Sequence, residues 1–140
     1  MGNGVFNMEK ELKVRCIVEG CVEGEAIVTT EGISFMGTVN PKTGYIIERK
    51  HEIEGECLQG KVLVYPRGKG STGGSYMLYD LVKNGAGPVG IINEQGESVT
   101  VIGAIIAELP MVDQADISEI KTGDHVCLDA TNGIVRVVKK

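Results

Sequence analysis

The chain has 140 residues, of which 42% are hydrophobic and 24% charged, and its formal net charge is −5 at pH 7. This length fits one globular domain and excludes a complete two-domain enzyme with an interdomain cleft. Because the surface is acidic overall, a general affinity for nucleic acid or anionic membranes is excluded, and any site for an anion must be local.

The N-terminal segment carries no targeting signal. It lacks the cationic start, apolar middle and small-residue cleavage site of a signal peptide, and no apolar run in the chain reaches the length of a membrane span. We predict a cytoplasmic protein with a single domain over residues 1–140, in which residues 1–8 are a disordered leader. The cysteines lack the paired spacing of metal or redox motifs, so we predict free thiols and no metal site: Cys16, Cys21, Cys57 and Cys127.

Short strands dominate the prediction. Several apolar segments bounded by Gly, Pro, Asn or Asp have strand character. They span residues 12–18, 25–30, 33–39, 44–48, 57–65, 88–92, 99–107, 125–130 and 133–138. We predict that residues 99–107 form a buried strand, an exposed part of which is available for a subunit interface. The last two segments form a hairpin, with positive φ angles at Asn132 and Gly133 in a tight turn.

The spacing of apolar residues predicts an amphipathic helix from Thr72 or Gly73 to Lys83. A second, short helix is predicted at residues 116–120, capped by its first residue. The longer helix lies between two predicted strands, and the three together form one β-α-β crossover. The loop before the helix then lies at the carboxyl end of the first strand, where open α/β sheets bind ligands.

That loop reads "PRGKGSTGGSY" over residues 66–76. The first turn of a helix presents unpaired N–H groups and a partial positive charge, glycines let a ligand approach the backbone, and Arg67 and Lys69 add full charges. This composition predicts an anion site. The loop is not a Walker phosphate loop, because Leu63 stands where the first glycine is required and Gly70 follows the lysine.

A dinucleotide fingerprint, G-x-G-x-x-G, matches Gly68, Gly70 and Gly73, and Glu94 lies at the end of the next predicted strand. The prediction of one β-α-β unit counts against this motif, because a dinucleotide domain repeats that unit. A stand-alone nucleotide-binding module stays an alternative. So does a phosphocarrier domain, although neither histidine lies at the start of a predicted helix, and we expect His51 to be structural and to hydrogen-bond its own loop.

Several separated blocks, among them "VYPRGKGSTGGSYMLYDL", "GAGPVGIINEQGE" and "VIGAIIAELP", resemble the swivel domain of the aconitase X family over residues 32–110. The resemblance implies a β-rich α/β fold, the swivelling β/β/α domain similar to the C-terminal (fourth) domain of aconitase. It also implies the small subunit of a heteromeric hydro-lyase, inactive alone, whose large catalytic subunit holds a 4Fe-4S cluster. The implied reaction converts (R)-5-phosphomevalonate to trans-anhydromevalonate 5-phosphate in an archaeal-type mevalonate pathway. A related dehydratase, such as one acting on cis-3-hydroxyproline, is the alternative.

The resemblance assigns roles within the glycine loop. The serine of the Gly-Lys-Gly-Ser segment, Ser71, is the implied proton acceptor, and a helix N-terminus with nearby cations would favour its alkoxide. We expect the substrate, a phosphorylated hydroxy acid, to contact Arg67, Lys69, Gly70 and Thr72. Two other readings stay open: Ser71 or Thr72 caps the helix, and Arg67 and Lys69 pair with acidic residues of the partner subunit.

Overall fold

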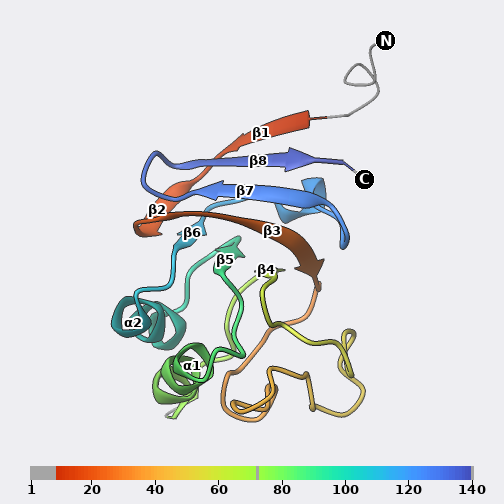
Figure 1. Cartoon of the computed structure of the whole chain (residues 1–140), viewed down its shortest axis with the longest axis vertical. Coiled ribbons are helices and arrows are strands. Elements are labelled where there is room, and N and C mark those ends of the chain that lie inside the picture. Colours follow the sequence, from red (N-terminus) through yellow and green to blue (C-terminus); the bar gives the residue numbers. More distant parts are fainter. Residues whose placement is uncertain (1–8, 72, 140) are drawn as a thin grey trace.

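The structure of the protein, a computed structural model, describes residues 9–71 and 73–139 (Figure 1). Within these ranges it contains one eight-stranded sheet, two α-helices and a short 3-10 helix. The strands are β1 (Glu9–Lys13), β2 (Arg15–Val18), β3 (Cys21–Val28), β4 (Val62–Tyr65), β5 (Gly90–Asn93), β6 (Met111–Asp113), β7 (His125–Asp129) and β8 (Ile134–Val138). The helices are α1 (Gly74–Lys83), α2 (Ser98–Ala107) and the 3-10 helix η2 (Ile117–Glu119). The predicted leader, residues 1–8, lies outside the described residues.

The sheet has an antiparallel part, β1-β8-β7-β3, and a parallel part, β3-β4-β5-β6, that share β3, and β2 pairs antiparallel with β6 at the end of the parallel part. Its strand order is β1-β8-β7-β3-β4-β5-β6-β2. The first part of β3 pairs antiparallel with β7, whereas residues 26–28 pair parallel with β4. Because Val14 alone separates β1 from β2, the two ends of this strand order are joined through the chain, which gives the sheet a barrel-like closure.

The parallel strands are buried on both faces, and neighbouring residues alternate between two cores. Leu63 on β4 and Ile91 on β5 belong to the core beneath α1 and α2, whereas Val64 and Ile92 belong to the core shared with the antiparallel part. A period of two with both faces apolar is typical of parallel strands that are covered on each side. The carboxyl ends of β3, β4 and β5 lie along one edge, and the glycine loop leaves from this edge.

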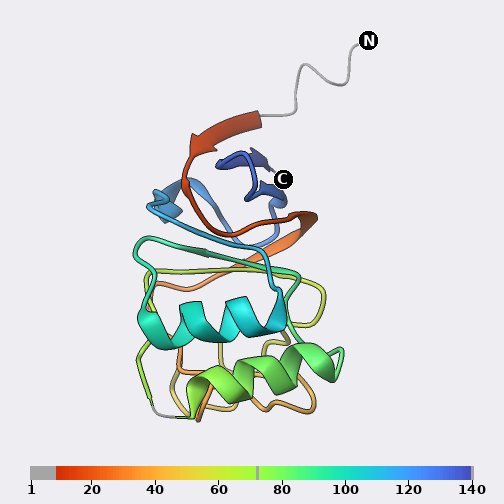
Figure 2. The same ribbon diagram turned by 90° about the vertical axis from the view of Figure 1, so that its left-hand side faces the viewer.

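The segment predicted as a buried strand at residues 99–107 is the helix α2, so that prediction was wrong. β5 and β6 are parallel neighbours, and a parallel pair needs a crossover connection, which α2 provides. The buried residues of α2 are small ones on one helix face, Thr100, Gly103 and Ala104. Figure 2 shows α2 lying along α1 on the same side of the sheet. The chain therefore has a second β-α-β unit, β5-α2-β6, beyond the one that was predicted.

Residues 29–61 form a long connection between β3 and β4, although strands were predicted at 33–39 and 44–48. Within this described segment the backbone forms isolated bridges and turns in place of strands. Turn-forming residues such as Pro41 and Gly44 interrupt the extended runs. The apolar side chains of the connection are nevertheless buried in the core beneath the helices: Ile33, Phe35, Val39, Ile46, Ile53 and Leu58.

Other predicted elements are confirmed with small changes. α1 begins at Gly74 and connects β4 to β5 as the predicted crossover. β7 and β8 form the predicted hairpin, but Gly133 has a positive φ of 70° and Asn132 does not. The predicted short helix is the 3-10 helix η2, and its N-cap residue is Asp116 as expected. No helix in the described part of the chain is long and apolar enough to cross a membrane.

Candidate functional site

The glycine loop connects the carboxyl end of β4 to the start of α1. It starts at Pro66, and the helix begins at Gly74 with Gly73 as its N-cap residue. The Gly74 N–H donates to the Ser71 carbonyl oxygen at 2.9 Å, so Ser71 lies directly before the first turn. The Ser71 side chain does not cap the helix, so the capping alternative was wrong for Ser71. Thr72, the other predicted cap and a predicted substrate contact, lies outside the described residues.

The Ser71 hydroxyl is half-buried beside a second hydroxyl that the sequence did not indicate. Its Oγ atom lies 3.2 Å from Ser34 Oγ. The Ser34 hydroxyl donates to the Met36 carbonyl oxygen at 2.8 Å, which leaves the Ser34 oxygen to accept the proton of Ser71. Ser34 belongs to the long connection, 37 residues from Ser71 in sequence, so no local spacing reveals the pair.

Glu97 lies against the inner side of the glycine loop. As the N-cap residue of α2, it accepts hydrogen bonds from Val99 N–H at 2.7 Å and Thr100 N–H at 3.2 Å. A Cβ atom at Gly68 would lie 2.6 Å from Glu97 Oε1, and one at Gly70 would lie 3.0 Å from Oε2. A carboxylate of the chain itself therefore lies against both glycines, where its negative charge would oppose a bound pyrophosphate. This contact counts against the dinucleotide alternative, even though the chain has a second β-α-β unit.

The two cations of the loop differ in their surroundings. Lys69 Nζ lies 3.0 Å from both carboxylate oxygens of Glu48. A hydrogen bond from the Thr38 hydroxyl, supported by Lys69, holds the pKa of Glu48 below its usual range against the effect of burial. Arg67 is exposed and forms no ion pair with any residue that the structure describes. Arg67 is thus available to an external anion, whereas Lys69 already has a partner within the chain.

His51 has a structural role, as predicted. Its side chain is buried, with Nε2 3.0 Å from the Gly32 carbonyl oxygen, and Nδ1 accepts a hydrogen bond from Ile53 N–H at 3.3 Å. Because Nδ1 accepts, the ring proton is on Nε2 and is donated to Gly32. Gly32 packs closely on the loop, since a Cβ atom there would lie 2.8 Å from Lys69 Cγ. His51 therefore supports the wall of the glycine loop opposite Glu97.

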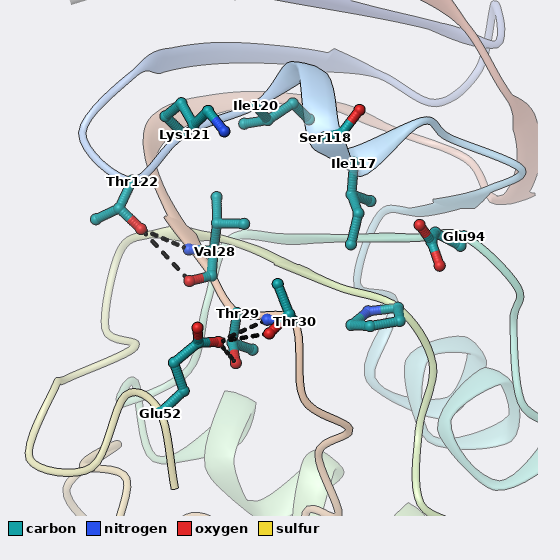
Figure 3. A pocket seen from close by; sticks show the side chains of 11 residues that line it. Val28, Thr29, Thr30, Glu52, Glu94, Ile117, Ser118, Ile120, Lys121 and Thr122 are labelled. Atoms are coloured by element: carbon teal, nitrogen blue, oxygen red, sulfur yellow. Dashed lines mark hydrogen bonds between the residues drawn. The ribbon is translucent and has the colours of Figure 1, made fainter.

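A pocket opens beside the glycine loop at the carboxyl ends of β3, β4 and β5 (Figure 3). Its charged lining residues are Lys121 and two carboxylates, Glu52 and Glu94. Glu52 accepts hydrogen bonds from the Thr29 hydroxyl at 2.6 Å and from Thr30 N–H at 2.7 Å, and these bonds lower its pKa. A lining with more carboxylates than ammonium groups does not suit an anionic substrate. Of the predicted site residues that the structure describes, Arg67, Lys69, Gly70 and Ser71, none lines this pocket.

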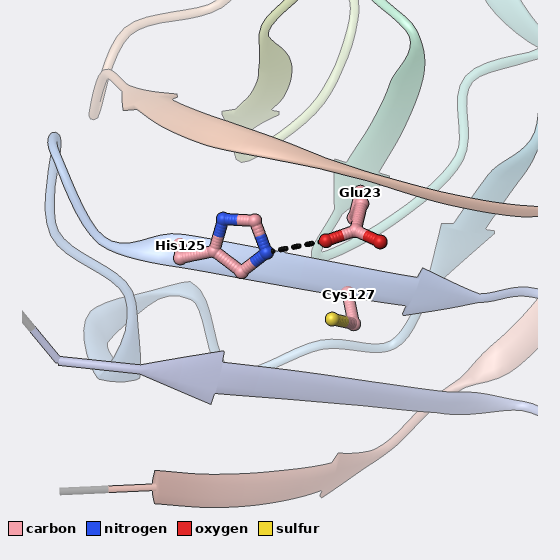
Figure 4. Close-up of side chains that lie close together, drawn as sticks. All are labelled: Glu23, His125 and Cys127. Carbon is pink, nitrogen blue, oxygen red and sulfur yellow. Dashed lines mark hydrogen bonds and ion pairs between the residues drawn. The ribbon is translucent and has the colours of Figure 1, made fainter. Parts of the chain in front are cut away.

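Glu23, His125 and Cys127 are the one group of three metal-type ligands in residues 9–71 and 73–139 (Figure 4). They lie on β3 and β7, with His125 Nε2 2.7 Å from Glu23 Oε1. Burial and then the charge of Glu23 raise the pKa of the Cys127 thiol. All four cysteines are free, as predicted, and this group contains one of them. The described residues therefore do not offer the set of thiolates that an iron–sulfur cluster requires.

The fold is that of an aconitase-type swivel domain. The structure of 3-isopropylmalate dehydratase from Methanocaldococcus jannaschii aligns with a TM-score of 0.56 at 17% identity, covering 86% of this chain and 84% of that chain. At this level of identity the likeness shows the fold alone. The predicted fold class is thereby confirmed.

More similar proteins define the family. A family model of the aconitase X swivel domain matches residues 11–137. The crystal structure of aconitase X (holo-form) from Thermococcus kodakaraensis aligns with a TM-score of 0.91 at 46% identity, covering 93% of this chain and 99% of that chain. The phosphomevalonate dehydratase small subunit of Methanosarcina acetivorans is 48% identical over 132 residues, 92% of each chain. The chain belongs to the aconitase X swivel domain family.

Proposed function

We propose that this chain is the small subunit of a hydro-lyase that dehydrates (R)-5-phosphomevalonate to trans-anhydromevalonate 5-phosphate, with Ser71 as the proton acceptor. The observation that carries the substrate is the 48% identity to a phosphomevalonate dehydratase small subunit over nearly the whole chain. The geometry supports the role of Ser71, because its hydroxyl is accessible directly before the first turn of α1 and does not serve as a cap.

The reaction removes a proton from C2, next to the carboxylate, and the hydroxyl group from C3, so that a C2–C3 double bond forms and water is released. Ser71 accepts the C2 proton as an alkoxide. The N–H groups in the first turn of α1 and the charge of Arg67 favour this anion. When Ser71 is ionised, the Ser34 hydroxyl can turn from the Met36 carbonyl and donate to the alkoxide, because the two oxygens are 3.2 Å apart.

The substrate carries a carboxylate and a phosphate, and we assign its direct ionic contact to Arg67. The guanidinium is exposed, and its planar set of donors suits bidentate binding of either group. Lys69, Gly70 and Thr72 complete the proposed set. Lys69 would contact the substrate by exchanging the Glu48 carboxylate for a substrate oxygen, which keeps its charge paired throughout.

Removal of the C3 hydroxyl is assigned to a large subunit with a 4Fe-4S cluster, since the described residues of this chain do not fit one. Apolar side chains suited to docking are exposed in two places: Met36 and Tyr76, beside the loop, are 50% and 71% exposed, and Ile105 and Ile106 are exposed in the last turn of α2. Burying Met36 and Tyr76 against the partner would also exclude water from Ser71. Four free cysteines fit a reducing compartment, and we propose a cytoplasmic location.

The test is anaerobic purification of the chain together with its large subunit, followed by iron analysis and a dehydration assay with phosphomevalonate. We expect activity from the iron-bearing complex and none from this chain alone. The same complex should be inactive on cis-3-hydroxyproline. Turnover of hydroxyproline in place of phosphomevalonate, or activity of the isolated chain, would contradict the proposal.

A further inference from the structure

We infer that Glu97 is a positioning residue, which fixes the backbone of residues 68–71 and thereby the place of the Ser71 oxygen. The consequence for catalysis rests on the proposed function of Ser71. The contact between Glu97 and the loop does not depend on the proposed function, because it is a property of the folded chain.

The carboxylate of Glu97 is held firmly on the side of α2. It accepts hydrogen bonds from Val99 N–H at 2.7 Å, from Thr100 N–H at 3.2 Å and from the Thr100 hydroxyl at 3.1 Å. Serine, threonine, aspartate and asparagine are the residues that usually cap a helix N-terminus. Capping alone therefore does not explain a glutamate at this position, and its longer side chain has a second contact.

The second contact is with the glycine loop. A Cβ atom at Gly68 would lie 2.5 Å from Thr100 Oγ1 and 2.6 Å from Glu97 Oε1. At Gly70 a Cβ atom would lie 3.0 Å from Glu97 Oε2 and 3.5 Å from Cδ. A neighbour less than 3.0 Å from a Cβ atom must shift, so a side chain at Gly68 would displace Thr100 Oγ1 and Glu97 Oε1 from the hydrogen bonds that hold them. The contact at Gly70 is tighter than ordinary packing. The glycines of this loop thus accommodate Glu97.

The opposite side of the loop is fixed by the long connection. Lys69 N–H donates to the Ile33 carbonyl oxygen at 2.9 Å, and Gly32 packs on the Lys69 side chain. One residue beyond Gly70, Ser71 meets Ser34 on the same connection. The loop is therefore held between two walls, and Glu97 forms the inner one.

Glu97 is itself anchored to the sheet. The preceding residue, Gly96, donates its N–H to Asp113 Oδ2 at 2.9 Å, and Arg15 Nη2 donates to the same oxygen at 2.7 Å. A chain of contacts thus connects Arg15 on β2 and Asp113 on β6, through Gly96 and Glu97, to the loop that carries Ser71. Because α2 amides already bind the carboxylate, much of its charge is offset before it can oppose an alkoxide at Ser71.

Glu97→Asp separates positioning from capping. Aspartate caps a helix well and keeps the charge, but its side chain is one methylene shorter and no longer reaches the loop. In the assembled enzyme we expect kcat to fall about 10- to 100-fold, because displacing a catalytic group by about 1 Å lowers enzyme rates by up to about 100-fold. The thermal midpoint should stay within about 2 °C, because the cap is kept. In the full chain, amide hydrogen exchange of Lys69 should become at least about tenfold faster, because its bond to Ile33 loses the support of the inner wall.

Two further variants complete the design. Gly70→Ala should lower kcat when Glu97 is present, and adding it to Glu97→Asp should restore part of kcat, because the new methyl group fills the gap. Glu119→Asp, at a carboxylate that pairs with Lys10, is the matched control and should change neither kcat nor the exchange of Lys69.

The outcomes distinguish this inference from the proposed function. Unchanged kcat and unchanged Lys69 exchange in Glu97→Asp would overturn the positioning role, whatever Ser71 does. If Lys69 exchange accelerates while a Ser71→Ala enzyme remains active, Glu97 holds the loop as inferred but the serine is not the base. The inference would also be contradicted if Glu97→Asp lowered kcat and the added Gly70→Ala substitution lowered it further, because the methyl group is expected to restore part of kcat.

Discussion

Replacing Arg15 with alanine is expected to lower the free energy of unfolding by about 2 kcal/mol. Arg15 on β2 donates from Nε at 2.8 Å and from Nη2 at 2.7 Å to the two carboxylate oxygens of Asp113 on β6. The Asp113 side chain is 1% exposed and that of Arg15 is 57% exposed. In the variant, Asp113 would keep its hydrogen bond from Gly96 N–H but lose both bonds to the guanidinium.

The magnitude follows from this uneven burial. Removing one partner of a fully buried ion pair costs about 3–5 kcal/mol, because the remaining charge stays buried. Here water can enter the space left by a half-exposed arginine, so the loss is closer to that of a charged hydrogen bond, about 1.5–3 kcal/mol. For a domain of this size, 2 kcal/mol corresponds to about 7 °C in the thermal midpoint.

The loss should also depend on pH. Burial raises the pKa of Asp113, but the hydrogen bonds from Arg15 and Gly96 and the charge of Arg15 outweigh it, so the pKa lies below its usual range. The stabilisation is present above the ordinary aspartate value of about 3.9 and is lost as the pH falls through the lowered value. The difference between the native chain and the variant should therefore be largest near pH 7 and shrink toward pH 3.

Urea unfolding at several pH values provides the assay. Arg136→Ala is the matched control, because Arg136 forms a 3.3 Å pair with Glu11 in which both side chains are about half exposed. This control should cost less than about 0.5 kcal/mol. Equal losses in the two variants, or a loss in Arg15→Ala that does not change with pH, would refute the reasoning.

Three other substitutions test separate features. Gly103→Ala would place a Cβ atom 3.1 Å from Leu78 Cδ2 and from the Ser75 backbone on α1, so it should lower the free energy of unfolding in urea by about 1–3 kcal/mol; an unchanged value would mean that the helices have room to spare. Tyr65→Phe removes a buried hydroxyl that lies near the Thr100 and Asn93 side chains but forms no hydrogen bond of normal geometry with a described residue, so stability should be unchanged or rise by up to about 1 kcal/mol, and a clear loss would show that one of these two side chains is a partner. Ile105→Asp, on the exposed face of α2, should keep the thermal midpoint within about 2 °C but weaken binding of the large subunit at least about tenfold; undiminished affinity would place the docking face elsewhere.

The two helices show how far the sequence predicts the fold. α1 was predicted because polar residues mark its exposed face and apolar residues its buried face. α2 was taken for a strand because it is apolar all round and rich in β-branched residues, and because its cap, Glu97, is not a usual start signal. The need to connect two parallel strands, which is a property of the whole sheet, outweighed this local preference.

The sequence predicted only part of the candidate site, because the rest depends on how distant segments come together in the fold. The glycine loop and its cations lie in one stretch of sequence, so composition and resemblance were enough to find them. Ser34, Glu48 and Glu97 come from other segments and meet the loop in the folded chain. Local spacing carries no information about contacts that the β-α-β units and the long connection bring together.

Turnover by the assembled enzyme carrying Ser71→Ala is the most direct test of the central claim, that this chain supplies the base. The account predicts that the complex still assembles and binds its iron, that kcat falls about 10²- to 10⁴-fold, and that exchange of the substrate C2 proton with solvent is lost. Ser118→Ala, at an exposed hydroxyl on η2 that is not among the proposed site residues, should behave as the native enzyme. An assembled Ser71→Ala enzyme with near-native turnover and C2 exchange would contradict the account.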